Sequence, residues 1–229
     1  MFASLNLGQN RGDSDENVIA NWRLFGAAAG IPTERFVYGK QVHGANVRVV
    51  GPADAYPICD AAVWEPADGY VTNVPGLPLA VFTADCAPLL LHDSAAGVAA
   101  ALHCGWRSTA ADIMGVAVEK MCALGAHAQD ICAAVGPCIG PCCFETGEEV
   151  PAAAEELLGG DTAGLWTEKE NGKYMVDLPG IVLRRLGQLG VRAENRRWLG
   201  ECTMCQPERY WSHRFTNGVR GSQANVIML

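Results

Sequence analysis

Two histidines and one cysteine stand where strand-like runs of the sequence end. His43 closes one apolar run before Gly44, and His103 closes another before a glycine turn. Cys86 follows a third apolar run, directly after Asp85. Side chains at strand ends beside glycine turns commonly face a cleft. Two imidazoles and one thiolate are the donors of a three-ligand zinc site with an open fourth position, which is typical of catalytic zinc.

The neighbours of these residues could supply the other groups that such chemistry needs. Asp85 could orient a ligand or move a proton. Arg107 follows the turn after His103, next to an expected helix start, where an arginine can clamp an anion. The three ligands are far apart in the sequence, so spacing alone leaves other interpretations open. Cys86 fits a small buried hydrophobic residue equally well, and Arg107 fits a surface ion pair.

A second set of thiols competes as a metal site. It comprises Cys138, Cys142, Cys143, Cys202 and Cys205. Four of these could form a structural zinc site, but only the last pair has the CxxC spacing, which is modest evidence. Packing of buried thiols is therefore the favoured interpretation. The histidines His92 and His127 are expected to be structural and surface residues, respectively.

The elements that must position these residues are buried strands and amphipathic helices. Helices are predicted between Asp13 and Gly30, from Thr109 to Leu124, from Glu145 to Leu158 and after Asp177. Strand-like runs cover residues 36–42, 46–50, 79–83, 88–92, 98–103, 131–135 and 224–228. These runs are almost continuously apolar, as in strands that are buried on both faces. The pattern predicts one mixed α/β or α+β domain with a mixed sheet as its core.

The composition limits the classes of function. Of 229 residues, 49% are hydrophobic and 18% are charged, which excludes a disordered chain. A net charge of −8 argues against broad contact with a nucleic acid backbone, although one small phosphate pocket remains possible. The start of the chain does not resemble a signal peptide, and no apolar run could span a membrane. We therefore expect a cytoplasmic protein with reduced thiols. The composition leaves its oligomeric state open.

A series of motifs extends along nearly the whole chain in one order. They occupy residues 4–8, 12–13, 40–44, 67–72, 79–88, 103–109, 135–140, 142–145, 202–203 and 212–214. With these motifs the sequence resembles the laccase-domain family, also called the multicopper polyphenol oxidases. Part of that family has been reassigned as zinc-dependent purine nucleoside phosphorylases with adenosine deaminase activity.

The resemblance implies a fold, a ligand set and a reaction. Residues 1–229 would form one catalytic domain of the laccase-domain type, with a mixed β-sandwich core and helices packed outside. His43, Cys86 and His103 would be the metal ligands. The substrates would be phosphate and a purine nucleoside such as adenosine, inosine or methylthioadenosine, and the products a free base and ribose 1-phosphate. Two positions depart from the family pattern. Cys104 replaces a usual alanine, and residues 216–221 are a loose version of the Thr-Gly-Arg ending, which leaves Arg220 unassigned.

The choice of metal follows from a count of donors. Five histidines are too few for several copper centres, whereas one metal bound by two histidines and a cysteine fits. We therefore expect Zn²⁺, with Cu²⁺ as the alternative. In this scheme Asp85 moves a proton and Arg107 holds phosphate. Asn6 and Gln41 donate hydrogen bonds to the ribose or the base.

Three other functions remain open. One is copper-dependent oxidation of phenols. Another is a hydrolase that acts on a cell-wall precursor, with Cys86 as nucleophile and His103 as base. The third is a zinc-stabilised interaction module without catalytic activity.

Overall fold

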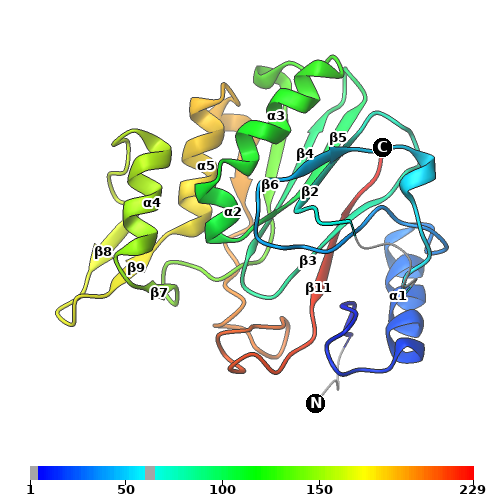
Figure 1. Ribbon diagram of the computed structural model, residues 1–229, viewed down its shortest axis with the longest axis horizontal. Helices are drawn as coiled ribbons and strands as arrows, with labels where there is room; N and C mark the ends of the chain where they lie inside the picture. Colours follow the sequence, from blue (N-terminus) through cyan, green and yellow to red (C-terminus); the bar gives the residue numbers. More distant parts are fainter. Residues whose placement is uncertain (1–4, 60–64) are drawn as a thin grey trace.

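A six-stranded mixed sheet forms the centre of the molecule (Figure 1). The structure is a computed structural model, and it describes residues 5–59 and 65–229. In spatial order the strands are β1 (Val47–Val49), β2 (Gly69–Thr72), β5 (Val98–Cys104), β4 (Ala87–Asp93), β6 (Cys132–Val135) and β10 (Arg196–Trp198). The inner strands β2, β5, β4 and β6 pair antiparallel, and β1 and β10 join the two edges in parallel.

Strand β5 shows why these runs are apolar on both faces. All seven of its residues are buried. Leu102 belongs to the core on one face of the sheet, and Ala101 belongs to the core on the other. A tight turn joins β4 to β5, in which Asp93 accepts hydrogen bonds from the amides of Ala95 and Ala96, and Gly97 has a φ of 62°. The sheet is therefore an inner layer of the fold.

A two-stranded ribbon covers one face of the sheet. It pairs β3 (Leu79–Thr83) antiparallel with β11 (Gln223–Ile227). The outer side of this ribbon packs against α1 (Asp15–Ala29), where Trp22 is fully buried and stacks on Phe36 with ring centroids 4.4 Å apart. Sheet, ribbon and helix thus form successive layers.

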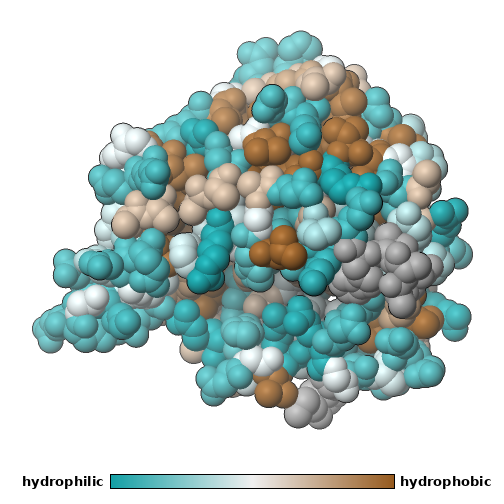
Figure 2. Space-filling view, in the orientation of Figure 1, coloured by the Kyte–Doolittle hydropathy of each residue, from teal (hydrophilic) through white to brown (hydrophobic). Residues whose placement is uncertain are grey.

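Helices cover the opposite face of the sheet. They are α2 (Trp106–Ala110), α3 (Ile113–Ala123), α4 (Glu149–Leu158) and α5 (Leu178–Gln188). A small sheet projects beside them, in the order β7 (Glu145–Thr146), β9 (Tyr174–Val176) and β8 (Trp166–Glu168). Short 3-10 turns occupy Pro52–Asp54, Ala128–Asp130 and Ala193–Asn195. Figure 2 shows hydrophilic side chains over the projecting sheet, and apolar ones gathered near α3 and the neighbouring strands.

The predicted mixed fold with a β core and outer helices is confirmed, and the helices differ in detail. The cap of the first helix is Ser14, one residue later than the predicted cap Asp13, because the Ser14 hydroxyl accepts the amide of Asn17. The second is two helices, because Asp112 has a φ of 58° and caps α3. The fourth starts at Glu149, which places Pro151 in the first turn, where no amide hydrogen is needed.

The strand predictions are correct in the apolar centre and weaker elsewhere. Residues 36–42 form only isolated bridges rather than a strand. The sequence pattern does not predict the strands β2, β7, β8, β9 and β10, because each has at most four residues, which is too few to show a period. Within residues 5–59 and 65–229, no helix has the length and apolar character needed to cross a membrane.

Candidate metal centre

The structure brings together the three predicted metal ligands. One ligand atom from each of His43, Cys86 and His103 lies within 4.8 Å of the other two. The Cys86 Sγ is 3.8 Å from the His43 Nε2, and the two imidazole rings meet edge to face with centroids 4.8 Å apart. The register of β4 against β5 pairs Ala87 with Cys104, which sets Cys86 and His103 at the same end of the sheet. This arrangement fits a single metal ion.

The backbone around these three residues, called the trio below, has conformations that allow their side chains to converge. His43 has a φ of 61° and Asp85 has a φ of 99°, both in the left-handed region that side chains rarely adopt. Gly105 leaves space between the ligands. A Cβ at that position would lie 2.8 Å from the His43 Cδ2 and 3.2 Å from the Cys86 Sγ. The chain therefore keeps a gap among its donor atoms, as a metal site requires.

Asp68 holds two of the three ligands in place. It is fully buried, and its Oδ1 accepts hydrogen bonds from the His103 Nδ1 at 2.8 Å and the His43 amide at 2.9 Å. Its Oδ2 accepts from the amides of Val42 and Gly44. A carboxylate on Nδ1 directs the lone pair of Nε2 toward a metal. The sequence analysis did not assign Asp68. Its one local signal is an acid at the start of an apolar run.

Two residues of the trio, Cys86 and His103, have strongly shifted pKa values. Burial disfavours the Cys86 thiolate, but the charge and hydrogen bonds of His103 and His43 outweigh it and lower the pKa of Cys86 to about 6. Burial also opposes the charged form of His103, while Cys86 and Asp68 raise its pKa to about 9. Without a metal, these pKa values favour a thiolate beside an imidazolium at neutral pH. A metal ion must displace the proton from that imidazole.

Asp85 is engaged by the C-terminal part of the chain. Its Oδ1 accepts a hydrogen bond from the Thr203 hydroxyl at 2.6 Å, and its Oδ2 accepts from the Arg214 amide at 2.7 Å. Its backbone carbonyl accepts from the Ile139 amide at 2.8 Å. Through its carboxylate and its backbone carbonyl, Asp85 thus contacts three other segments beside Cys86. Thr203 is a further residue that sequence reasoning missed.

The side chain of Asn6 forms hydrogen bonds to residues from both ends of the chain. Its Oδ1 accepts hydrogen bonds from the amides of Gly8 and Ser222, and its Nδ2 donates to the Gly8 carbonyl and to Asp13. The side chain is fully buried. These contacts join the start of the chain to its end. The predicted hydrogen bond from Asn6 to a substrate stays a prediction.

Gln41, two residues before His43 in the sequence, lines a cavity. Its amide pairs with the backbone of Phe82, with both hydrogen bonds at 2.7 Å. The cavity has a volume of about 510 Å³. It is lined by Gly8, Gln9, Asn10, Arg11, Gly39, Lys40, Gln41, Phe82 and Ser222. The contact of Gln41 with a substrate also stays a prediction.

Arg220 and Arg107 differ in burial and in the groups that they contact. Arg220 is partly buried and donates to the Ser222 hydroxyl at 2.8 Å. Burial and the nearby charge of Arg11 lower its pKa to about 10, while Cys86 and Asp85 act in the opposite direction. Arg107 is exposed, and its guanidinium stacks over the Trp106 ring at 4.2 Å. Arg220, which the loose C-terminal motif had left unassigned, is therefore close enough to Cys86 and Asp85 to be influenced by their charges.

The remaining histidines do not extend the metal centre. Among the described residues, the trio is one of two groups of histidine, cysteine or acid that could hold a metal ion, and the other consists of cysteines. His92, His127 and His213 belong to neither group. The part of the chain that the structure describes thus offers a single site with histidine donors, which falls short of a multicopper set.

The chain is similar to a known family along its whole length. The sequence model described as multi-copper polyphenol oxidoreductase laccase matches residues 1–229. Purine nucleoside phosphorylase ORF3 of Streptomyces griseus is 41% identical over 192 residues, which are 83% of this chain and 74% of that protein. Adenosine deaminase RL5, from an unknown prokaryotic organism, is 32% identical over 215 residues, or 93% of this chain and 82% of that protein.

A solved structure of a third relative agrees in fold. Purine nucleoside phosphorylase YlmD of Geobacillus stearothermophilus is 34% identical over 229 residues, covering 99% of this chain and 84% of that protein. Its crystal structure superimposes with a TM-score of 0.93 at 33% identity and covers 99% of this chain and 85% of that one. The fold that carries the trio is therefore shared with this relative.

Proposed function

The chain belongs to the multi-copper polyphenol oxidoreductase laccase family, and on that premise we propose that it is a zinc-dependent purine nucleoside phosphorylase that also deaminates adenosine. The observation that carries this proposal is the convergence of His43, Cys86 and His103 on one point. Relatives named for the two reactions support it. The substrates would be a purine nucleoside with phosphate or, for deamination, adenosine with water.

The metal would be held by the two imidazoles and the thiolate, and the surrounding contacts suit it. Asp68 fixes the ring of His103, and Gly105 leaves the space between donors open. His43 is exposed, so the trio is accessible from one side. When bound, zinc supplies Lewis acidity, which polarises a substrate oxygen or activates water.

The cavity lined by Gln41, two residues before His43, would hold the nucleoside. Phe82 is among its lining residues, so an aromatic side chain borders the space proposed for the purine. Arg11 and Lys40 supply positive charge in the same lining. Arg220 lies where it feels both the charge of Arg11 and that of Cys86. These cationic groups would hold phosphate close to the trio, because guanidinium groups bind phosphate oxygens in pairs.

The chemistry assigns distinct tasks to the chain. In phosphorolysis, a phosphate oxygen bonds to the anomeric carbon as the bond to the purine nitrogen breaks, and the departing base takes up a proton. In deamination, water adds to the carbon that bears the amino group, and ammonia leaves.

Asp85 is proposed as the proton carrier or as the residue that positions Cys86. Its two hydrogen-bonded oxygens favour positioning. Arg107 remains the alternative phosphate clamp.

The direct experiment is incubation of zinc-loaded protein with adenosine, with and without phosphate, and identification of the products by mass. Adenine that forms only with phosphate supports phosphorolysis, and inosine supports deamination. If neither forms, the proposal is wrong. Arg220→Lys and Arg107→Lys variants, assayed for the Michaelis constant of phosphate, distinguish the two candidate clamps.

Two further functions each have an observation in their favour. The family description names a copper oxidoreductase, so metal analysis of protein made without added copper, together with a phenol oxidation assay, tests that activity. The lowered pKa of Cys86 beside His103 also suits a thiol hydrolase. Trapping of an acyl group on Cys86 would identify that chemistry, whereas protection of Cys86 by zinc supports the metal site.

A further inference from the structure

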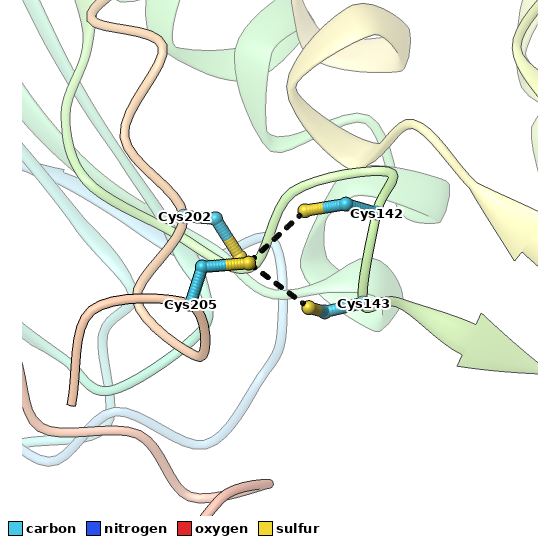
Figure 3. Close-up of side chains that lie close together, drawn as sticks. All are labelled: Cys142, Cys143, Cys202 and Cys205. Atoms are coloured by element: carbon cyan, nitrogen blue, oxygen red, sulfur yellow. Dashed lines mark hydrogen bonds between the residues drawn. The ribbon is translucent and has the colours of Figure 1, made fainter.

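Four cysteines outside the histidine site lie together at the junction of two segments (Figure 3). Cys142 and Cys143 come from the connection between β6 and β7, and Cys202 and Cys205 come from the segment after β10. The four sulfur atoms all lie within 4.8 Å of one another. Figure 3 shows the side chains pointing toward a common centre.

The sulfur spacing matches a mononuclear metal site. Zinc bonds to thiolates at about 2.3 Å, so a tetrahedral ion holds its sulfurs about 3.8 Å apart. The Sγ of Cys205 is 3.5 Å from that of Cys142 and 3.4 Å from that of Cys143. A disulfide needs its sulfurs at about 2.0 Å. We propose that Cys142, Cys143, Cys202 and Cys205 bind a second zinc ion, in addition to the ion of the histidine site.

Burial of thiols in the core does not explain this cluster. Cys142 and Cys205 are exposed, and Cys143 is partly exposed. Cys138, on the same loop, shows the contrast. It is fully buried, its sulfur is not part of the cluster, and it packs in the main core. The packing interpretation favoured by the sequence therefore fits Cys138, and the exposed thiols need another role.

The backbone is shaped to support the four sulfurs. The carbonyl of Gly140 accepts the amides of Cys143 and Phe144, each at 3.0 Å, which folds the loop back on itself. The Gly140 amide donates to the Cys202 Sγ at 3.3 Å. Backbone amides that donate to sulfur stabilise ligating thiolates. A Cβ on Gly140 would lie 3.3 Å from the Cys202 Cβ and 3.4 Å from the Cys142 Sγ, so the backbone of Gly140 passes directly beside the cluster.

The position of the cluster indicates a structural role. Four thiolates fill a tetrahedral shell and leave no position for a substrate, as in structural zinc sites. Thr203 lies within the segment that carries Cys202 and Cys205, and its hydroxyl donates to Asp85 beside the histidine site. The ion would fasten this segment to the loop of Cys142. It would thereby hold the contact on Asp85 in place from outside the reaction site.

The first experiment measures the metal content of the full-length protein, purified with reductant and zinc. We expect about two zinc ions per chain, one for each cluster. Cys142→Ser and Cys205→Ser should each lose about one ion, and His43→Ala should lose the other. Cys122→Ser is the matched control, because Cys122 is an exposed thiol on α3 outside both clusters. It should keep both ions.

A second experiment needs no variant and so does not depend on whether a variant folds. Native zinc-loaded protein is treated with iodoacetamide, and its cysteines are mapped by mass spectrometry before and after chelation. Cys122 should be alkylated from the start, whereas Cys142 and Cys205 should react only after chelator is added. Alkylation of Cys142 and Cys205 as fast as Cys122 overturns the proposal. So does a disulfide within the cluster, iron in place of zinc, or one zinc ion per chain that Cys142→Ser retains.

Discussion

The two clusters of donor atoms differ in composition and surroundings. The histidine site combines two imidazoles with one thiolate, rests on the buried carboxylate of Asp68, and has an exposed side at His43. The cysteine cluster has sulfur donors only, and its closest hydrogen-bond support is the amide of Gly140. One arrangement leaves room for a reactant, and the other would enclose its ion. The comparison shows that the role of a metal site depends on the groups and the space around the donor atoms as well as on the donors themselves.

The strongest test of this contrast removes one ligand from each cluster. His43→Ala, Cys86→Ala and His103→Ala should each lower turnover at least about a hundredfold, because the metal loses a direct ligand. Turnover with adenosine and zinc content are measured together. Cys205→Ser should retain the zinc of the histidine site. Normal zinc content and turnover in all three alanine variants would show that the site is wrong.

A second test addresses the support of the ligands. Asp68→Asn leaves the shape of the side chain but removes the charge that orients His103, and we expect zinc affinity to fall about 10- to 100-fold. Competition with a chromogenic chelator measures it. Asp54→Asn is the control, because Asp54 pairs with Arg48 away from the metal donors. An Asp68→Asn variant with unchanged affinity would mean that the hydrogen bond to His103 does not tune the site.

A third test measures how the rate of alkylation of Cys86 in the metal-free protein depends on pH. The pKa of Cys86 is lowered to about 6, so its thiolate forms as the pH rises through that value. An ordinary thiol, with a pKa of about 8.5, remains largely protonated at pH 7. Cys86 should therefore be alkylated several-fold faster than free cysteine at pH 7. Its rate should level off above that pH, and its advantage should disappear above about pH 8.5, where free cysteine is ionised as well. A rate that rises only above pH 8 would contradict the assigned charge state.

The smallest expected effect concerns stability. Loss of the proposed second ion in Cys142→Ser should lower the melting temperature by several degrees, since each kcal/mol corresponds to about 2–4 °C for a chain of this size. The melting temperature of His43→Ala should fall less, because sheet packing holds the strands around that site. Scanning calorimetry in zinc-containing buffer measures both. Equal shifts in the two variants would remove the distinction between a structural and a reactive site.

Local patterns were sufficient for the main features of the fold, and they singled out the candidate metal ligands without excluding other roles for them. The apolar stripe of α1, with Gly30 at its end, needed nothing beyond neighbouring residues. The same holds for the continuous apolar strand β5, which carries His103 next to its last residue. The break at Asp112 was not predictable, because a left-handed residue between two helices leaves no mark in the hydrophobic period.

Several site residues lay beyond sequence reasoning for a common reason. Asp68 reaches His103 across 35 positions, and Thr203 reaches Asp85 across 118. Such pairs depend on strand register and loop closure, which spacing along the chain does not encode. The hydrogen bonds that Asn6 makes to the amides of Gly8 and Ser222 depend in the same way on how the two ends of the chain meet. The predicted contact of Asn6 with a substrate stays a prediction.

The sequence by itself determined the donor types, the buried strands and the family, because these follow from side-chain chemistry and from periods of a few residues. Tertiary structure alone decided which donors lie close enough together to share an ion. Pairing of β4 with β5 brings Cys86 beside His103. Backbone pairing between Cys138 and Cys202 brings two cysteine segments together and leaves Cys138 itself in the core. Contacts between distant segments arise from packing of the whole chain, so no local pattern could have separated the buried thiol from its clustered neighbours.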